Sequence, residues 1–197
     1  MFKTKTLNQS AKPKERYLQV FLIAAVTAAL FFLPFIIMDK GLFLFYGDYN
    51  VQQIPFYKLA HEAVRSGNIF WSQYTDLGAN FIGSYSFYLL GSPFFWLTIP
   101  FPSAAVPYLM GPLLILKFGC ASLTGYVYLK RYVQNQNFAV IGGMLYAFSG
   151  FSVYNIFFNH FHEAIVFFPL MLAALDEYMY QRRRGIFALT VFACCFV

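Results

Sequence analysis

The feature that most constrains this chain is an apolar run from Leu18 to Met38, which follows a polar tail containing five basic residues. About 20 apolar residues are enough to cross a bilayer as a helix. A cleaved signal peptide is the alternative, because it also combines a basic start with an apolar run. The run is long enough to span, and no Ala-x-Ala cleavage site follows it. The sequence therefore favours a retained signal anchor.

The composition also indicates a membrane protein. Hydrophobic residues make up 59% of the chain and charged residues 11%, whereas soluble domains carry about 25% charged residues. A net charge of +6 would suggest nucleic acid in a soluble protein. Here Lys and Arg form short clusters beside apolar runs, as expected from the excess of basic residues in cytoplasmic loops of membrane proteins. The positive charge thus reflects the orientation of the chain in a lipid membrane, and no nucleic-acid partner is implied.

The positions of the basic clusters decide which apolar runs cross the membrane. Further runs lie at 81–101, 107–129, 138–158, 164–180 and from 186 onward. If the 81–101 run spans, the basic clusters at 130–131 and 182–184 fall opposite the basic N-terminus, an arrangement that short loops disfavour. If it does not span, all three clusters share the cytoplasmic side. Several Gly, Ser and Pro residues also interrupt this run, which is typical of a re-entrant or interfacial segment.

These runs predict an all-α polytopic membrane protein in the bacterial cytoplasmic membrane. Residues 1–17 form a cytoplasmic basic tail, and 18–197 form part of one multi-helix membrane domain. The region 39–106 becomes a long external loop, in which Pro55 to Gly67 reads as an amphipathic surface helix. The last run, from 186, has about half the length of a crossing. We therefore expect an N-terminal fragment, truncated in its fifth spanning helix.

Asp48 is the external carboxylate with the strongest chemical context. It lies about ten residues beyond the first helix, among amide and aromatic side chains. Such a carboxylate can act as a general base toward a hydroxyl, or ligate a divalent cation. An Asx turn ahead of the surface helix is the alternative. We expect the other acids and the histidine of this loop to be surface groups: Asp39, Glu62 and His61.

A second external group combines His160, His162 and Glu163 within four residues. This spacing could bind a metal or shuttle a proton, although a catalytic zinc site usually requires a third protein ligand. Lys117 stands inside an otherwise apolar helix, where a cation is costly and often functional. It could pair with a lipid phosphate, snorkel to the surface, or pair with an acid elsewhere. Whether a metal binds is left open.

The chain resembles the YfhO-like bacterial membrane proteins, which are grouped with glycosyltransferases of the GT-C fold. The resemblance covers nearly the whole chain. It rests on Asp48 with Gln52 and Pro55, on Ser66-Gly-Asn-Ile-Phe-Trp, on Leu77-Gly-Ala-Asn-Phe, on Leu145-Tyr-Ala-Phe-Ser-Gly-Phe, and on His160 with Phe168-Pro-Leu. The GT-C fold has a long first external loop with two surface helices. The resemblance thus implies the same architecture that the charge pattern predicts.

The resemblance also implies an activity: transfer of a sugar from a polyprenyl-phosphate carrier to a cell-envelope polymer such as lipoteichoic acid. Carried over, Asp48 is the catalytic acid or base, and His162 with Glu163 forms a second catalytic pair. Substrate-binding roles fall to Gln52, Arg65, Lys117 and His160. No cofactor is certain, and a divalent cation stays an open option.

Two other functions compete with sugar transfer. A transporter or lipid flippase would use the same polar residues without covalent chemistry, but it would place polar groups near the midplane of several helices. In the sequence only Lys117 is clearly at that depth, which favours an enzyme. A scaffold for envelope machinery would tolerate any replacement of Asp48.

Overall fold

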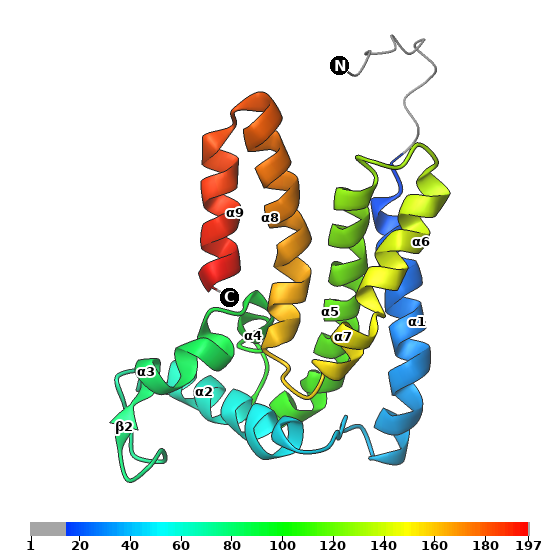
Figure 1. Ribbon diagram of the computed structural model, residues 1–197. Coiled ribbons are helices and arrows are strands. Elements are labelled where there is room, and N and C mark those ends of the chain that lie inside the picture. Colours follow the sequence, from blue (N-terminus) through cyan, green and yellow to red (C-terminus); the bar gives the residue numbers. More distant parts are fainter. Residues whose placement is uncertain (1–14, 197) are drawn as a thin grey trace.

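Long antiparallel helices dominate the fold, and a layer of short elements crosses one end of them (Figure 1). This computed structural model describes residues 15–196. Helix α5 is central and packs against α1, α6 and α8, while α9 packs against α8. The long helices are α1 (Tyr17–Met38), α5 (Val106–Leu129), α6 (Gln136–Ala147), α8 (Phe161–Gln181) and α9 (Arg184–Phe196), and the short α7 (Gly150–Tyr154) follows α6.

Three helical segments in the described part are long and apolar enough to cross a membrane: Tyr17–Met38, Ser103–Leu129 and Gln136–Tyr154. The sequence predicted five crossings. Helix α8 has the length, with 21 residues, but it carries a buried acid in its first turn and two acids near its end. Helix α9 has only 13 described residues. Both form a hairpin beside the other long helices in Figure 1.

The predicted helix 138–158 is interrupted. Helix α6 ends at Ala147, and α7 begins after Ser149, whose hydroxyl accepts a hydrogen bond from the Ser152 N–H at 3.3 Å. The serine hydroxyl thus accepts from an N–H group at the start of α7, which would otherwise bond a backbone carbonyl of a continuous helix. The following prediction, a helix from 164, also shifts, because α8 begins at Phe161. His162 and Glu163 are therefore in its first turn, whereas the sequence placed them in a loop.

The region 39–106 folds into short elements: η1 (a π-helix, Tyr49–Gln53), α2 (Ile54–Ser66), β1 (Trp71–Ser72), β2 (Ala79–Asn80), α3 (Phe81–Tyr85), η2 (a π-helix, Ser86–Leu90), α4 (Pro93–Trp96) and η3 (a 3₁₀ helix, Ser103–Ala105). The two strands pair antiparallel as a hairpin. The amphipathic helix predicted at 55–67 corresponds to α2 and ends at Gly67, which takes the left-handed conformation.

The sequence predicted that the 81–101 run does not span, and in the structure this run does not form one long helix. The Asn80 side chain caps α3 by accepting a hydrogen bond from the Gly83 N–H at 2.7 Å. Ser92 caps α4 in the same way and is followed by Pro93, which fits only the first turn of a helix. These caps divide the run into pieces too short to span. In Figure 1, α4 lies near the start of α8, so the run turns back toward the long helices.

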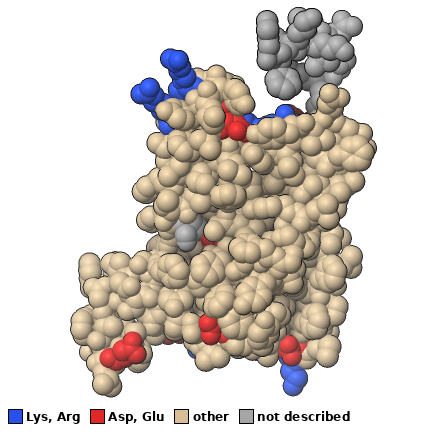
Figure 2. Space-filling model, viewed as in Figure 1, with Lys and Arg blue, Asp and Glu red and all other residues tan. Residues whose placement is uncertain are grey.

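The described basic residues at 16, 130–131 and 182–184 lie at one end of the molecule. Lys130 bonds Glu15 at 2.8 Å, ahead of α1, and Arg131 bonds Glu177 of α8 at 2.6 Å. Arg183, in the loop after α8, lies 3.7 Å from the same carboxylate. Figure 2 shows charged side chains at both ends and an almost uncharged belt between them. The described basic residues of the three clusters thus lie at one end, and their placement on the cytoplasmic side of a membrane stays a prediction.

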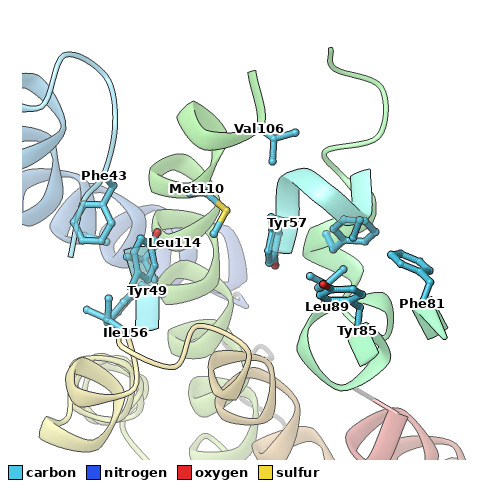
Figure 3. Close-up of a cluster of buried hydrophobic side chains, with 14 residues drawn as sticks. Phe43, Tyr49, Tyr57, Phe81, Tyr85, Leu89, Val106, Met110, Leu114 and Ile156 are labelled. Carbon is cyan, nitrogen blue, oxygen red and sulfur yellow. The ribbon is translucent and has the colours of Figure 1, made fainter. Parts of the chain in front are cut away.

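The largest buried apolar cluster lies where α2 and the 81–90 segment pack against α5 (Figure 3). It includes Tyr49 and Tyr57 from η1 and α2, Phe81 and Leu89 from the following segment, and Leu114 from α5. The layer that crosses the end of the long helices is therefore attached through a packed core, rather than by loops alone. That attachment fixes the polar groups described next.

Candidate functional site

Lys117 lies at the centre of a buried polar cluster. Its side chain is 1% exposed, about 11 residues into α5 and so roughly 16 Å from the start of that helix. The Nζ atom lies 2.9 Å from Glu163 Oε1, and it donates to the Asn159 backbone oxygen at 3.0 Å and to Asn159 Oδ1 at 2.8 Å. A lysine has three N–H donors. Two of them bond Asn159, and the ammonium group also forms an ion pair with Glu163.

Glu163 joins Lys117 to the turned-back 81–101 segment. Its Oε1 atom also accepts a hydrogen bond from Ser92 Oγ at 2.5 Å. The second oxygen, Oε2, is buried and has no hydrogen-bond partner among the described residues. A buried ion pair is expensive unless further hydrogen bonds surround it. Here Ser92 and Asn159 supply such bonds, so α5, α8 and two connecting segments are held at one point.

The two histidines lie on different sides of this cluster. His160 Nδ1 accepts a hydrogen bond from Gln53 Nε2 at 3.2 Å. Burial, and second the positive charge of Lys117, lower the pKa of His160 to about 4. His162 is fully buried, and its Nε2–H donates to the Ser152 oxygen at 2.7 Å. The Nδ1 atom of His162 is left without a partner in the described part of the chain.

A stripe of side chains with polar atoms faces inward along η1 and α2. Tyr49, Gln53, Tyr57 and His61 repeat every four residues, and each is at most 1% exposed. Residues four apart lie on one face of a helix. Burial, and second the negative charge of Glu163, raise the pKa of Tyr57 well above its ordinary value. Tyr57 therefore belongs to the buried inward face of α2.

The prediction that His61 is a surface group is wrong. Its Nε2–H donates to the Thr98 oxygen at 3.1 Å, and Nδ1 faces Ser103 Oγ at 3.0 Å. Arg65, one turn later, donates from Nη1 to the Phe101 oxygen at 2.6 Å. Both side chains therefore attach α2 to the end of the 81–101 segment. The substrate-binding role predicted for Arg65 is untested. Its guanidinium bonds the Phe101 oxygen, at the end of the 81–101 segment.

Asp48 is half-buried at the start of η1. Its side chain makes no capping hydrogen bond to that helix within the described residues. The loop is closed instead by Asn50, whose Oδ1 accepts from the Phe45 N–H at 2.9 Å. This bond runs back to an N–H five residues earlier, so it is not an Asx turn, in which the side chain bonds the backbone two residues on. Asp48 is connected to the cluster through η1, which ends at Gln53 and its contact with His160.

Two cavities open beside the cluster, one between the 81–101 segment and the α8–α9 hairpin and one between α6, α7 and that hairpin. The first has a volume of about 710 Å³ and a mainly apolar lining that includes Phe87, Trp96 and His160. The second, of about 630 Å³, is bounded by α6, α7 and α8. Both lie within the size range of ligand pockets, roughly 300 to 1,000 Å³. His160 thus faces an apolar space on one side and Gln53 on the other.

Metal binding by the two histidines and Glu163 finds no geometric support. Between residues 15 and 196, no group of three or more His, Cys, Asp or Glu side chains is arranged to hold a metal. Glu163 is engaged by Lys117, and the bonds of the two histidines run to separate partners. The donor set does not fit a divalent cation in this arrangement.

The sequence identified part of the cluster. It singled out Lys117, Glu163, His160 and His162, and the structure brings the first two into direct contact. It missed the partners that complete the cluster, which are Gln53, Tyr57, Ser92 and Asn159. For Gln53 a signal existed, since it lies on the four-residue repeat of the inward face, whereas the predicted Gln52 is one position away. For Ser92 and Asn159 the local sequence contains no comparable signal.

Comparison with known proteins agrees with this architecture. The family described as Bacterial membrane protein YfhO matches residues 19–197. No curated protein and no solved structure matches the chain. The match covers nearly all of the described residues, including the whole buried cluster, so the chain belongs to the YfhO family of bacterial membrane proteins.

Proposed function

We propose that this chain forms part of a membrane glycosyltransferase that moves a sugar from a polyprenyl-phosphate carrier to an external cell-envelope polymer, with Asp48 as the catalytic base. One observation carries the proposal. Asp48 starts the short helix whose last residue, Gln53, bonds His160, and His160 lines the 710 Å³ apolar cavity. A carboxylate and an apolar cavity of this size, linked through one helix, suit a substrate with a polar head and a lipid tail.

In the proposed reaction the hydroxyl oxygen of the acceptor forms a bond to the anomeric carbon of the sugar. Asp48 accepts the proton that this hydroxyl loses. The bond from that carbon to the carrier phosphate breaks, and its electron pair leaves with the phosphate. Lys117 could offset that charge only by giving up one of its three present acceptors. His162 and Glu163 act in this scheme by holding the segments around the cavity. No step requires a metal.

Replacement of Asp48 tests the proposal. The full-length protein with Asp48→Asn or Asp48→Ala is expressed in a deletion strain, and sugar incorporation into envelope polymers is measured. Loss of a positioned general base should lower incorporation by about 10²- to 10⁴-fold. Asp39→Asn is the matched control, because this carboxylate lies in the same region ahead of η1 and should tolerate the change. Normal incorporation by both Asp48 variants at normal expression would refute the catalytic role.

The structure also adds an observation that favours the transporter alternative. The sequence placed only Lys117 at membrane depth, whereas in the structure it contacts Glu163 and Asn159, and Ser92 from a third segment bonds Glu163. Polar groups contributed by several segments at one depth are typical of transporters. Uptake assays on reconstituted protein separate the two functions: substrate movement that survives Asp48→Asn favours transport, and sugar transfer lost in that variant favours the enzyme.

A further inference from the structure

A third hollow lies away from the Lys117 cluster, between the end of α2 and the β1–β2 hairpin. Its volume is about 290 Å³, at the lower limit of small-molecule pockets, which begin near ~300 Å³. It therefore suits one ring-sized unit. Its lining is less apolar than that of the 710 Å³ cavity and combines aromatic rings with polar side chains: Glu62, Ser66, Asn68, Trp71, Ser72 and Tyr74.

The aromatic wall of this hollow is held in place by the hairpin. Gly78 has a φ of +119°, and a Cβ added there would lie 2.9 Å from Cζ2 of Trp71, so the indole packs directly on the turn. Asp76 and Leu77 also have positive φ values, 45° and 66°. The Thr75 hydroxyl lies 2.7 Å from the hydroxyl of Tyr85 and ties the turn to α3. A ring fixed before binding loses little conformational entropy.

The charged side chain that lines the hollow is acidic, Glu62. Asp76 lies on the hairpin, and Arg65, on α2 just after Glu62, is bonded to the Phe101 oxygen of the 81–101 segment. Figure 2 shows acidic side chains at the lower left, where the hairpin lies in the matching view of Figure 1. This charge disfavours phosphate groups and the anionic surface of a bilayer. A carboxylate and amide accept hydrogen bonds from hydroxyls, and an indole face packs against C–H groups.

We propose that this hollow binds one neutral sugar unit of an external glycan. Trp71 packs against the ring, while Glu62 and Asn68 accept hydrogen bonds from its hydroxyls. Glu62 follows Asp48 by 14 residues along η1 and α2, so the two carboxylates are separated by about 20 Å at 1.5 Å per residue. A role for the bound unit as part of the acceptor polymer rests on the proposed function. The binding itself does not.

The two tryptophans of the chain allow a direct test. Trp96→Phe leaves Trp71 as the only tryptophan, and its fluorescence in the detergent-solubilised full chain is followed during titration with maltotriose, cellotriose and inorganic phosphate. We expect a saturable change with at least one neutral trisaccharide in the millimolar range, and none with phosphate. In that background Glu62→Gln should weaken binding about 3- to 10-fold, since it removes a charge-assisted hydrogen bond. Tyr180→Ala, an exposed tyrosine near the opposite end of α8, should change nothing.

Each other outcome overturns the proposal. Absence of saturation with both trisaccharides excludes the sugar site. A similar response to phosphate indicates an anion site, and a blue shift with phosphatidylcholine vesicles but not with sugars indicates a bilayer anchor. Asp48→Asn separates this inference from the proposed function, because that variant should keep sugar binding while losing sugar transfer. Normal sugar transfer with intact binding would refute the catalytic proposal alone.

Discussion

Two lysine–glutamate pairs at different depths have nearly the same geometry. Lys117 and Glu163 are 2.9 Å apart, and Lys130 and Glu15 are 2.8 Å apart. Their surroundings differ: both side chains of the first pair are 1% exposed, against 21% and 52% in the second. Water competes for the exposed pair and screens it, whereas the buried pair has lost its hydration. Distance alone therefore says little about what an ion pair contributes.

The two pairs also connect different parts of the chain. Lys130 ties the segment ahead of α1 to the end of α5, where hydrated residues remain free to exchange partners. Lys117 and Glu163 hold α5 to α8, and through Ser92 they hold the turned-back segment that borders the 710 Å³ cavity. The difference in burial thus predicts a difference in how much of the fold depends on each pair.

The largest effect is expected from removal of Glu163. Glu163→Ala leaves a buried Lys117 charge without its counterion, which should lower the free energy of unfolding by about 3–5 kcal/mol. Denaturant unfolding in detergent measures this. The double variant Lys117→Met/Glu163→Leu is the control and should recover most of the loss, because it removes both charges. Equal stability of Glu163→Ala and the unaltered protein would contradict the importance of the buried pair.

Removal of the Ser92 hydroxyl should have an intermediate effect. It donates to a buried carboxylate, and hydrogen bonds to charged groups contribute about 1.5–3 kcal/mol. Ser92→Ala should therefore lower the unfolding midpoint and expose the 81–101 segment to limited proteolysis. Ser66→Ala offers the comparison, since the Ser66 hydroxyl bonds only its own helix, at Ala63. Similar protease sensitivity of the two variants would argue against the link to Glu163.

Acid should destabilise the buried region through His160. Its pKa is about 4 in the folded protein, against an ordinary value of 6.5. The folded state therefore binds fewer protons, so stability falls as the pH drops from about 6.5 toward 4. His160→Gln should flatten this pH dependence of the unfolding midpoint. A pH profile that is unchanged by the substitution would show that other groups cause it.

The smallest effect is expected at the exposed pair. Lys130→Met removes the contact with Glu15, and surface ion pairs contribute about 0–1 kcal/mol. Added salt should reduce the contribution further, whereas it should barely change that of the buried pair. Unfolding curves at low and high salt for Lys130→Met and Glu163→Ala make the comparison. If Lys130→Met lowered the free energy of unfolding as much as Glu163→Ala does, burial would not explain the difference between the two pairs.

Much of the fold could be predicted because its signals are local. The length of the run from Leu18 to Met38, the caps and prolines in the 81–101 run, and the spacing of the basic clusters all lie within short stretches of sequence. They predicted the first helix, the broken segment and the shared end of the basic clusters. The break after Ala147 and the start of α8 at Phe161 were missed, because Ser149 caps only once the chain turns there.

The sequence by itself determined that this is an α-helical membrane protein with a basic end, a broken 81–101 segment and a few costly polar residues. Only the tertiary structure decided that Glu163 is the partner of Lys117, that Ser92 and Asn159 complete their bonds, and that His61 is buried. These pairs are separated by 37 to 71 residues, as for Thr98 with His61 and Ser92 with Glu163. Such contacts form when packed helices exclude water, and no local pattern encodes them.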